Sequence, residues 1–360
     1  MKITLNKING NFDGKECYVH ARATALNEKS LFMTLQKLRV EGSDTFLPLE
    51  YLKSDDGGIT WTKPVPLVKA DKFSDRISLL CDATPYYHRK TAQILIVGIY
   101  VSYSHDYSKA FDDEKREICY YTFNPETEKV SELKRLKTPA CEFPEGVFSG
   151  CGQIAENEEG EIYIPATTFL KERGLGESFF IKCTFDGEEL NYKERSSAVN
   201  VDIPRGAYEP SLVLFKNEMY MTLRNDEFGI VARFKDSSWQ TKKWCWDNGE
   251  AVETYNTQSH WLTVKDKLYL VYTRKAGFND HVFRHRAPLF ISEVSTDNLT
   301  LIRSTEKIAV VEKGARLGNF GVCSITENKA AVTVGEWMQP AGCEKYGSNN
   351  DVYISVIEGD

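Results

Sequence analysis

The sequence has no long apolar run, no cysteine motif and few histidines, and each absence excludes a class of protein. No segment of the 360 residues is apolar enough to span a membrane, and residues 1–6 do not begin a signal peptide. The nine cysteines show no CxxC spacing, and the six histidines form no HExxH motif. We therefore expect reduced thiols, a cytoplasmic location, and neither a metal nor a cofactor.

The chain also lacks the cationic excess that is typical of nucleic-acid-binding proteins. Its net charge is −7, and it has no glycine-rich phosphate loop. Hydrophobic residues make up 41% and aromatic residues 12% of the chain, a composition that suits packed β-sheets. These features predict a folded protein that binds neither nucleic acid nor membrane, and they leave its oligomeric state open.

Residues 54–61 predict a tight turn between two strands. Five positions fit the pattern Ser-x-Asp-x-Gly-x-Thr-Trp, namely Ser54, Asp56, Gly58, Thr60 and Trp61. We expect the Asp56 carboxylate to cap backbone N–H groups and Gly58 to supply a positive φ. Thr60 and Trp61 would then begin the return strand. The segment resembles the Asp-box of the sialidase (neuraminidase) superfamily and other β-propellers, in which the box is structural.

A unit of two strands joined by a polar turn recurs six times along the chain. The copies span residues 22–36, 84–99, 153–167, 209–224, 258–274 and 320–336, each with an apolar triplet in its second strand. The triplet centres, at residues 32, 95, 163, 220, 269 and 331, lie 63, 68, 57, 49 and 62 residues apart. This period predicts one all-β domain over residues 1–360, a six-bladed β-propeller with four-stranded antiparallel blades. Two separate sandwiches are the alternative, and residues 351–357 are expected to complete the first blade.

Equivalent positions of stacked blades should form a ring at the central channel. The residue ten or eleven places before each triplet centre is polar or charged in five of six copies, the six being Arg22, Thr84, Gln153, Glu209, Gln258 and Phe320. Polar side chains that converge on one pocket predict a ligand site there.

The order of charged residues resembles the sialidase active site over nearly the whole chain. Glu209 precedes Arg224 by fifteen residues, the spacing of a catalytic Glu and an active-site Arg in that family. The resemblance implies that Arg22, Arg224 and Arg286 bind a substrate carboxylate. Three guanidinium groups at one point repel each other unless an anion lies between them, and their planar forks fit a carboxylate.

The same resemblance implies roles for several acidic residues. Asp44 would be the general acid, Glu209 the base or the electrostatic partner of a cationic transition state, and Glu336 the residue that holds Arg22. Arg39, between Arg22 and Asp44 in the sequence, is expected to support the site. The implied partner is an acidic oligosaccharide that ends in a sialic, ulosonic or uronic acid.

One element of the family pattern is missing, because Phe320 stands where the family has its tyrosine nucleophile. Candidate substitutes are Tyr208, Tyr255, Tyr346, His20, His260, His281 and His285. Of these we expect His20 and His260 to be catalytic and His285 to support the site.

Three functions agree with this pattern. Water activated by a histidine or by Glu209 would give an inverting glycosidase, whereas proton abstraction beside a neutralised carboxylate would give a uronate lyase. A non-catalytic carbohydrate-binding propeller would also lack the tyrosine. We expect a glycosidase that releases a terminal carboxylate-bearing sugar.

Overall fold

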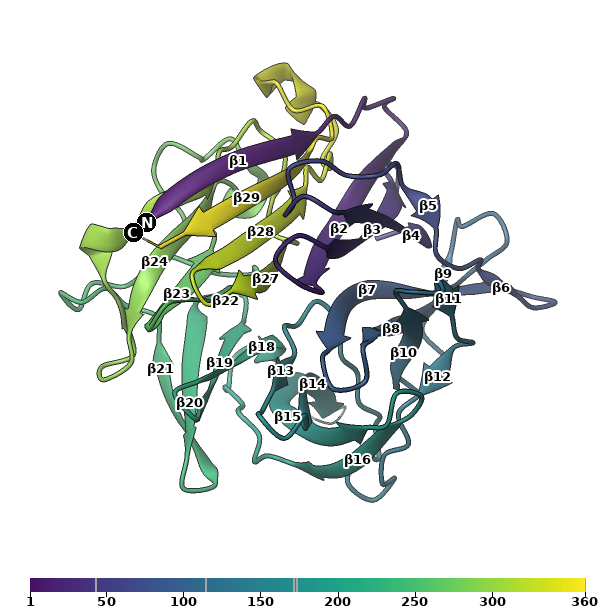
Figure 1. The fold of residues 1–360 in the computed structure, drawn as a ribbon, viewed down its shortest axis with the longest axis horizontal. Helices are drawn as coiled ribbons and strands as arrows, with labels where there is room; N and C mark the ends of the chain where they lie inside the picture. Colours follow the sequence, from purple (N-terminus) through teal and green to yellow (C-terminus); the bar gives the residue numbers. More distant parts are fainter. Residues whose placement is uncertain (43, 114, 171, 173, 360) are drawn as a thin grey trace.

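The computed structural model describes residues 1–42, 44–113, 115–170, 172 and 174–359, and within them the chain is an all-β propeller whose sheets surround a common centre (Figure 1). The predicted all-β propeller is therefore confirmed at the level of the fold. The described helices are 3₁₀ turns: η1 (Phe283–His285), η2 (Arg303–Thr305) and η3 (Cys343–Tyr346). No helix in the described ranges has the length and apolarity needed to cross a membrane.

The strands of the described residues form six sheets, five of which use strands that are consecutive in the chain. The first comprises β2 (Glu16–Ala25), β3 (Leu31–Arg39), β4 (Phe46–Ser54) and β5 (Val65–Pro66). The second comprises β6 (Asp71–Lys72), β7 (Ile77–His88), β8 (Gln93–Tyr103), β9 (Ala110–Phe111), β10 (Ile118–Asn124), β11 (Lys129–Val130) and β12 (Lys134–Arg135). The third comprises β13 (Ala155–Glu156), β14 (Ile162–Leu170), β15 (Leu175–Phe185), β16 (Leu190–Arg195) and β17 (Arg205–Gly206).

The fourth sheet comprises β18 (Tyr208–Phe215), β19 (Glu218–Arg224), β20 (Gly229–Lys235) and β21 (Ser238–Lys243). The fifth comprises β22 (His260–Val264), β23 (Lys267–Tyr272), β24 (Leu289–Ser295), β25 (Thr300–Leu301) and β26 (Lys307–Val310). The prediction of uniformly four-stranded, antiparallel blades is wrong. Loop segments add two-residue strands to the second and third sheets, and β17 pairs with β15 in parallel.

The sixth sheet joins the two ends of the chain. It contains β27 (Gly321–Thr326), β28 (Lys329–Gly335) and β29 (Val352–Glu358). The N-terminal β1 (Lys2–Ile8) pairs with β29 at the edge of this sheet, so that both termini lie together (Figure 1). The register of β1 and β29 runs from Lys2 opposite Glu358 to Ile8 opposite Val352. The expected C-terminal strand therefore forms, but it completes the last sheet and not the first blade.

The predicted hairpins and triplets are confirmed, since each triplet lies in the second strand of its hairpin, namely β3, β8, β14, β19, β23 or β28. The turn at residues 54–61 also forms as expected. The Asp56 carboxylate accepts hydrogen bonds from the backbone N–H groups of Ile59 and Thr60, at 3.0 and 2.9 Å, and the Trp61 indole donates to Gly58 O. Thr60 and Trp61 do not begin the return strand, however, which starts at Val65.

An identical bulge in three innermost strands decides which side chains face the centre. Residues 20–21 lie opposite residue 35, residues 82–83 opposite 98, and residues 209–210 opposite 223. The first residue of each bulge, His20, Asp82 or Glu209, has φ between 50° and 53°. Because side chains along a strand alternate between faces, one extra residue changes which of them point to the centre.

These bulges show that the predicted ring mixed two layers. Arg22, Thr84 and Ser211 hold equivalent positions, and Glu209 is equivalent to His20 and Asp82. In the other three sheets, the same position relative to the residue paired with the triplet centre is held by Cys151, Gln258 and Asn319. We call the resulting set the polar ring: His20, Asp82, Cys151, Glu209, Gln258 and Asn319.

Arg22 lies in the layer beneath the polar ring and is almost fully buried, with 1% of its surface exposed. Its guanidinium donates to Phe320 O at 3.3 Å and to Ala83 O at 3.1 Å, and it approaches Gln258 Oε1 at 3.5 Å. These contacts reach three other sheets. The side chain therefore connects the blades at the centre of the propeller.

Gly321 makes room for Arg22, because a Cβ at Gly321 would lie 2.8 Å from both Cα and Cβ of Arg22. We predict that Gly321→Ala costs about 1–3 kcal/mol of unfolding free energy through this overlap. The measurement is chemical denaturation, with Ser324→Ala on the exposed side of the same strand as control. An unchanged midpoint for Gly321→Ala would contradict this packing.

Candidate functional site

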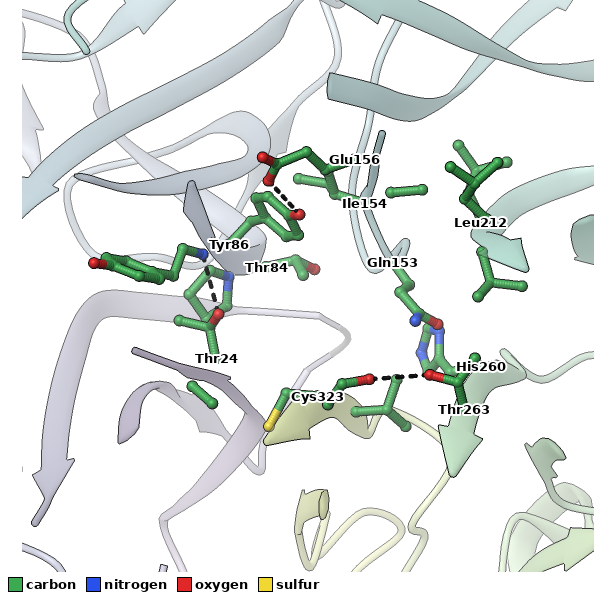
Figure 2. A pocket seen from close by; sticks show the side chains of 18 of the residues that line it. Thr24, Thr84, Tyr86, Gln153, Ile154, Glu156, Leu212, His260, Thr263 and Cys323 are labelled. Carbon is green, nitrogen blue, oxygen red and sulfur yellow. Dashed lines mark hydrogen bonds between the residues drawn. The ribbon is translucent and has the colours of Figure 1, made fainter. Parts of the chain in front are cut away.

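The innermost strands run between two cavities at opposite ends of the centre. One cavity, of about 1030 Å³, is lined by the polar ring except His20 and by the ends of the second strands, and we call it the arginine cavity. The other, of about 1280 Å³, is lined by the hairpin ends of the same strands, and we call it the hairpin-end cavity (Figure 2). The arginine cavity contains the cluster of charged groups that chemistry on an acidic ligand requires.

The polar groups of the hairpin-end cavity bond mainly to one another. Tyr86 donates to the Glu156 carboxylate at 2.7 Å (Figure 2), and the Gln153 side-chain oxygen accepts from Trp261 N at 2.9 Å. His260 shares a hydrogen bond of 2.8 Å with Ser211, and burial lowers the pKa of His260 to about 3. His260 and Gln153 thus face away from the arginine cavity, and their predicted roles there are not supported by their positions.

Three arginines, each at most 9% exposed, line the arginine cavity: Arg224, Arg286 and Arg316. Each is held by a different element. Arg224 ends β19 and lies over the Tyr208 ring at 4.5 Å, while Arg316 lies over the Trp337 ring at 4.2 Å. The Arg286 Nε donates to Asn256 O at 3.0 Å.

Part of their hydrogen-bonding capacity is unused. The buried Nε atoms of Arg224 and Arg316 have no partner among the described residues. Burial, together with the charges of Arg224 and Arg316, lowers the pKa of Arg286 to about 9. Burial also lowers the pKa of Arg316, to about 10. A bound anion relieves the repulsion between neighbouring like charges, so the cluster has the chemical properties of an anion site.

Two of the predicted acidic residues also line this cavity. Glu209 Oε1 pairs with Arg224 Nη2 at 3.0 Å, and its Oε2 accepts from Gln258 Nε2 at 2.8 Å. With both oxygens engaged, Glu209 fixes the position of Arg224. Asp44 lies on the loop between β3 and β4, where Tyr103 donates to its backbone oxygen at 2.7 Å.

The Asp44 carboxyl differs from Glu209 in having no hydrogen-bond donor among the described residues. Its side chain lines the cavity and is exposed to solvent. Partial desolvation by the surrounding cavity raises the pKa of Asp44, and the neighbouring Asp82 charge adds to the effect, while the arginines oppose it. A carboxyl with a raised pKa has the property required of a general acid.

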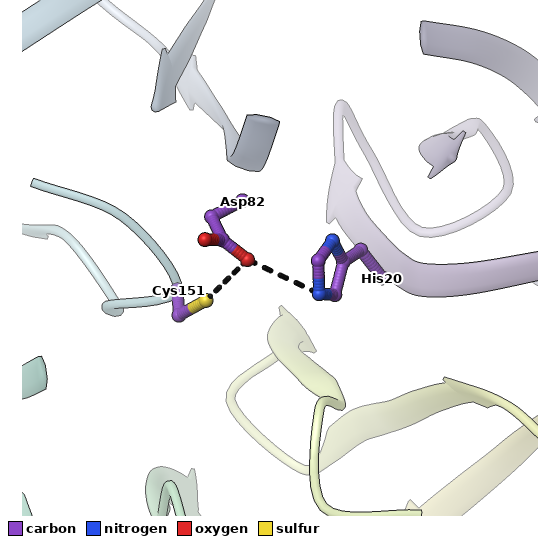
Figure 3. Close-up of side chains that lie close together, drawn as sticks. All are labelled: His20, Asp82 and Cys151. Carbon is purple, nitrogen blue, oxygen red and sulfur yellow. Dashed lines mark hydrogen bonds and ion pairs between the residues drawn. The ribbon is translucent and has the colours of Figure 1, made fainter. Parts of the chain in front are cut away.

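Asp82 and Cys151 line the same cavity, and the buried His20 lies close to both of them (Figure 3). Its Oδ1 is 3.1 Å from His20 Nε2 and accepts from the Cys151 thiol at 3.0 Å. Burial lowers the pKa of His20 to about 4, so the imidazole is neutral. Burial alone would raise the pKa of Asp82, but the His20 ring and the Arg22 guanidinium outweigh it and hold that pKa low.

The same three side chains are of types that bind metal ions, and their candidate ligand atoms lie within 4.8 Å of one another. A metal ion needs the thiolate form of cysteine. Burial raises the pKa of Cys151 well above its usual value, and the thiol proton is used in the bond to Asp82. Hydrogen bonding therefore explains this cluster, and the absence of a metal remains a prediction.

The structure brings together five of the predicted site residues: Asp44, Glu209, Gln258, Arg224 and Arg286. It separates Arg22 from them, because its guanidinium is bonded in the layer below. Glu336 does not hold Arg22 as expected. Its carboxylate accepts from the backbone N–H groups of Asn349 and Asp351 and from the Tyr353 hydroxyl.

The remaining candidates are also engaged elsewhere. Phe320 is fully buried against His260, at 4.7 Å between ring centres, and Arg39 donates to Asp106 O. The side chains predicted to replace the tyrosine nucleophile also have partners of their own. The hydroxyls of Tyr208 and Tyr255 bond to Asp226 and His285, His281 pairs with Glu312, and Tyr346 packs on His281.

Sequence analysis missed Arg316 and Asp82. Arg316 lies four residues before Phe320, outside the repeated unit. No periodic pattern in the sequence therefore indicated that it lines the arginine cavity. Asp82 did carry a signal. It lies two residues before Thr84, as His20 lies two before Arg22, and aligning the copies over this extra length would have identified it.

No protein-family model and no curated protein matches this sequence. Among solved structures, a protein of unknown function from Dyadobacter fermentans DSM 18053 is similar over 99% of both chains, with a TM-score of 0.71 and 14% identity. The fold is sialidase-like. The NanB sialidase of Streptococcus pneumoniae matches 98% of this chain with a TM-score of 0.69 and 12% identity, over 70% of its own length. Trypanosoma rangeli sialidase matches 99% of this chain with a TM-score of 0.65 and 13% identity, over 59% of its own length. At such identities the likeness shows the fold alone.

We predict that the arginine cavity binds a sugar carboxylate. Glucuronate at ten times its dissociation constant should stabilise the protein by about 1.4 kcal/mol, measured as a rise in the unfolding temperature. Glucose, which lacks the charge, should have no effect, and Arg316→Gln should lose the stabilisation by glucuronate. Arg303→Gln, in an exposed ion pair with Glu250, is the matched control. Equal stabilisation of both variants would contradict the site.

Proposed function

We propose that this sialidase-like propeller is a glycosidase that releases a terminal carboxylate-bearing sugar from an oligosaccharide. The observation that supports it best is the arginine cavity itself. Arg224, Arg286 and Arg316 meet there with unused donors, and the unbonded carboxyl of Asp44 lies in the same cavity. An anion clamp beside an acid with a raised pKa is an arrangement for cleaving a bond next to a bound carboxylate.

In this proposal the arginines hold the sugar carboxylate in a fixed plane and so fix the anomeric carbon relative to Asp44. Asp44 donates its proton to the leaving glycosidic oxygen. Substrate that covers the cavity excludes water, which raises the pKa of Asp44 further and keeps it protonated until the bond breaks. Glu209 keeps Arg224 in position, and its charge favours the cationic transition state.

The contacts favour hydrolysis over the alternatives. A lyase needs a base aimed at the carbon beside the carboxylate, but His20 is bonded to Asp82 and His260 lines the other cavity. In a protein that only bound acidic sugars, carboxylates within the anion site would weaken binding. The sialidases among the similar structures are consistent with this class of reaction at the level of the fold.

Loss of the Asp44 proton should abolish most turnover. We predict that Asp44→Asn lowers kcat by about 10²–10⁴-fold on oligosaccharides, measured by proton NMR of the released sugar, while ligand binding persists. Because wild-type Asp44 must be protonated, activity should fall as the pH rises through its raised pKa, and the variant should lack this dependence.

Leaving groups of low pKa, such as nitrophenol, need less protonation, so Asp44→Asn should lose less activity on them. Asp186→Asn, in an exposed turn, serves as the control. Vinylic proton signals in the product would show a lyase and overturn the proposal. Absence of turnover on every sialoside, ulosonide and uronide tested would also count against it.

A further inference from the structure

One carboxylate oxygen of Asp82 accepts no hydrogen bond from any described residue. Its Oδ1 receives both the His20 and the Cys151 contacts, and its Oδ2 has no hydrogen bond within the described ranges. The side chain is 24% exposed and lines the arginine cavity. Two partners on one oxygen fix the carboxylate plane, because they prevent rotation of the group. The second oxygen is thereby held ready at the cavity wall.

Apart from Asp44, the general acid of the proposed function, the other side-chain oxygens considered at this cavity are engaged. Tyr100 and Tyr103 line it, but their hydroxyls donate to Asp71 at 2.6 Å and to Asp44 O at 2.7 Å. Both oxygens of Glu209 are bonded. Asp112 and Glu117, also at the cavity, form ion pairs with Arg116 and Arg135.

We propose that Asp82 is the nucleophile of this cavity and that the substrate is a glycoside of a uronic acid. The proposal rests on the glycosidase function given above. Asp82 accepts from the Cys151 thiol, lies 3.1 Å from His20 Nε2 and stays ionised, which suits a group that must attack and later leave. A general base, in contrast, needs a pKa near the working pH.

The charge of Asp82 also selects among acidic sugars. In sialic and ulosonic acids the carboxylate is attached to the anomeric carbon, so an anionic oxygen attacking that carbon would approach a like charge. In a uronic acid the carboxylate is attached to C5, on the far side of the ring oxygen. The arginines can bind it there without bringing it against Asp82.

The reaction balances in two steps. Asp82 Oδ2 forms a bond to C1 as the bond from C1 to the glycosidic oxygen breaks, and Asp44 gives its proton to that oxygen. Water then attacks C1 while the Asp44 carboxylate takes a proton from it, and the ester bond to Asp82 breaks. The products are an alcohol and a uronic acid of unchanged anomeric configuration.

The first experiment compares methylumbelliferyl glycosides of glucuronic, galacturonic and N-acetylneuraminic acids, in both anomers, with the full-length protein. We expect turnover of a uronide with retention, followed by NMR of the first anomer formed. Turnover of the sialoside alone, or inversion of a uronide, would overturn the Asp82 proposal and leave the glycosidase function standing. No turnover of any acid glycoside would overturn both.

The second experiment traps the intermediate on the unaltered protein with the 2-deoxy-2-fluoro-glycosyl fluoride of the uronic acid that is turned over. Mass spectrometry of peptides should find the sugar on the segment of β7 that contains Asp82. A label on Tyr103, Glu209 or any other residue would contradict the assignment.

Variants complete the test. Asp82→Asn retains acceptor atoms for His20 and Cys151 and should fold, as checked by thermal unfolding, yet lower kcat by at least about 10³-fold. Azide should restore turnover to Asp82→Ala and yield a glycosyl azide of inverted configuration. Glu159→Gln, in the turn at the hairpin-end cavity, is the control and should retain wild-type kcat. Wild-type kcat in Asp82→Asn would overturn the proposal.

Discussion

One extra residue in each of three innermost strands determines how the centre of this propeller is built. The bulges at residues 20–21, 82–83 and 209–210 have the same register and place a residue with positive φ at the same height. Non-glycine residues in this conformation store strain of about 1–3 kcal/mol each, which the surrounding sheets must hold. In return, Asp82 and Glu209 reach the arginine cavity and His20 lies beside Asp82, while Arg22 remains below to join the blades.

The arginine cavity is the second constraint, and it opposes stability. Burying three guanidinium groups near one another is unfavourable unless carboxylates or a ligand compensate. Within the described residues, Glu209 compensates Arg224 directly, and the aromatic rings of Tyr208 and Trp337 support Arg224 and Arg316. The remaining imbalance is visible in the lowered pKa of Arg286. Such unrelieved charge is expected where a protein binds an anion and is not needed for the fold.

The fold class followed from the sequence because a hairpin and an apolar triplet leave a periodic trace in each repeat. The resemblance in order and spacing also singled out Glu209, Arg224, Arg286 and Asp44, which line one cavity in the structure. Arg22 and Phe320 were misplaced because the hairpins differ in length, so a count of ten or eleven residues from the triplet centre reaches different layers in different sheets. Arg316 escaped notice because it lies in a loop, where position depends on packing against Trp337 and not on periodicity. The closing strand was assigned to the wrong sheet because pairing between the two ends of a chain has no local signal.

A crystal structure of the protein soaked with glucuronate would test the central claim most directly. The sugar carboxylate should lie within hydrogen-bonding distance of Arg224, Arg286 and Arg316, with C1 facing Asp44 and Asp82. Glucuronate bound in the hairpin-end cavity, or a carboxylate that leaves the Nε atoms of Arg224 and Arg316 unpartnered, would contradict the assignment of the site.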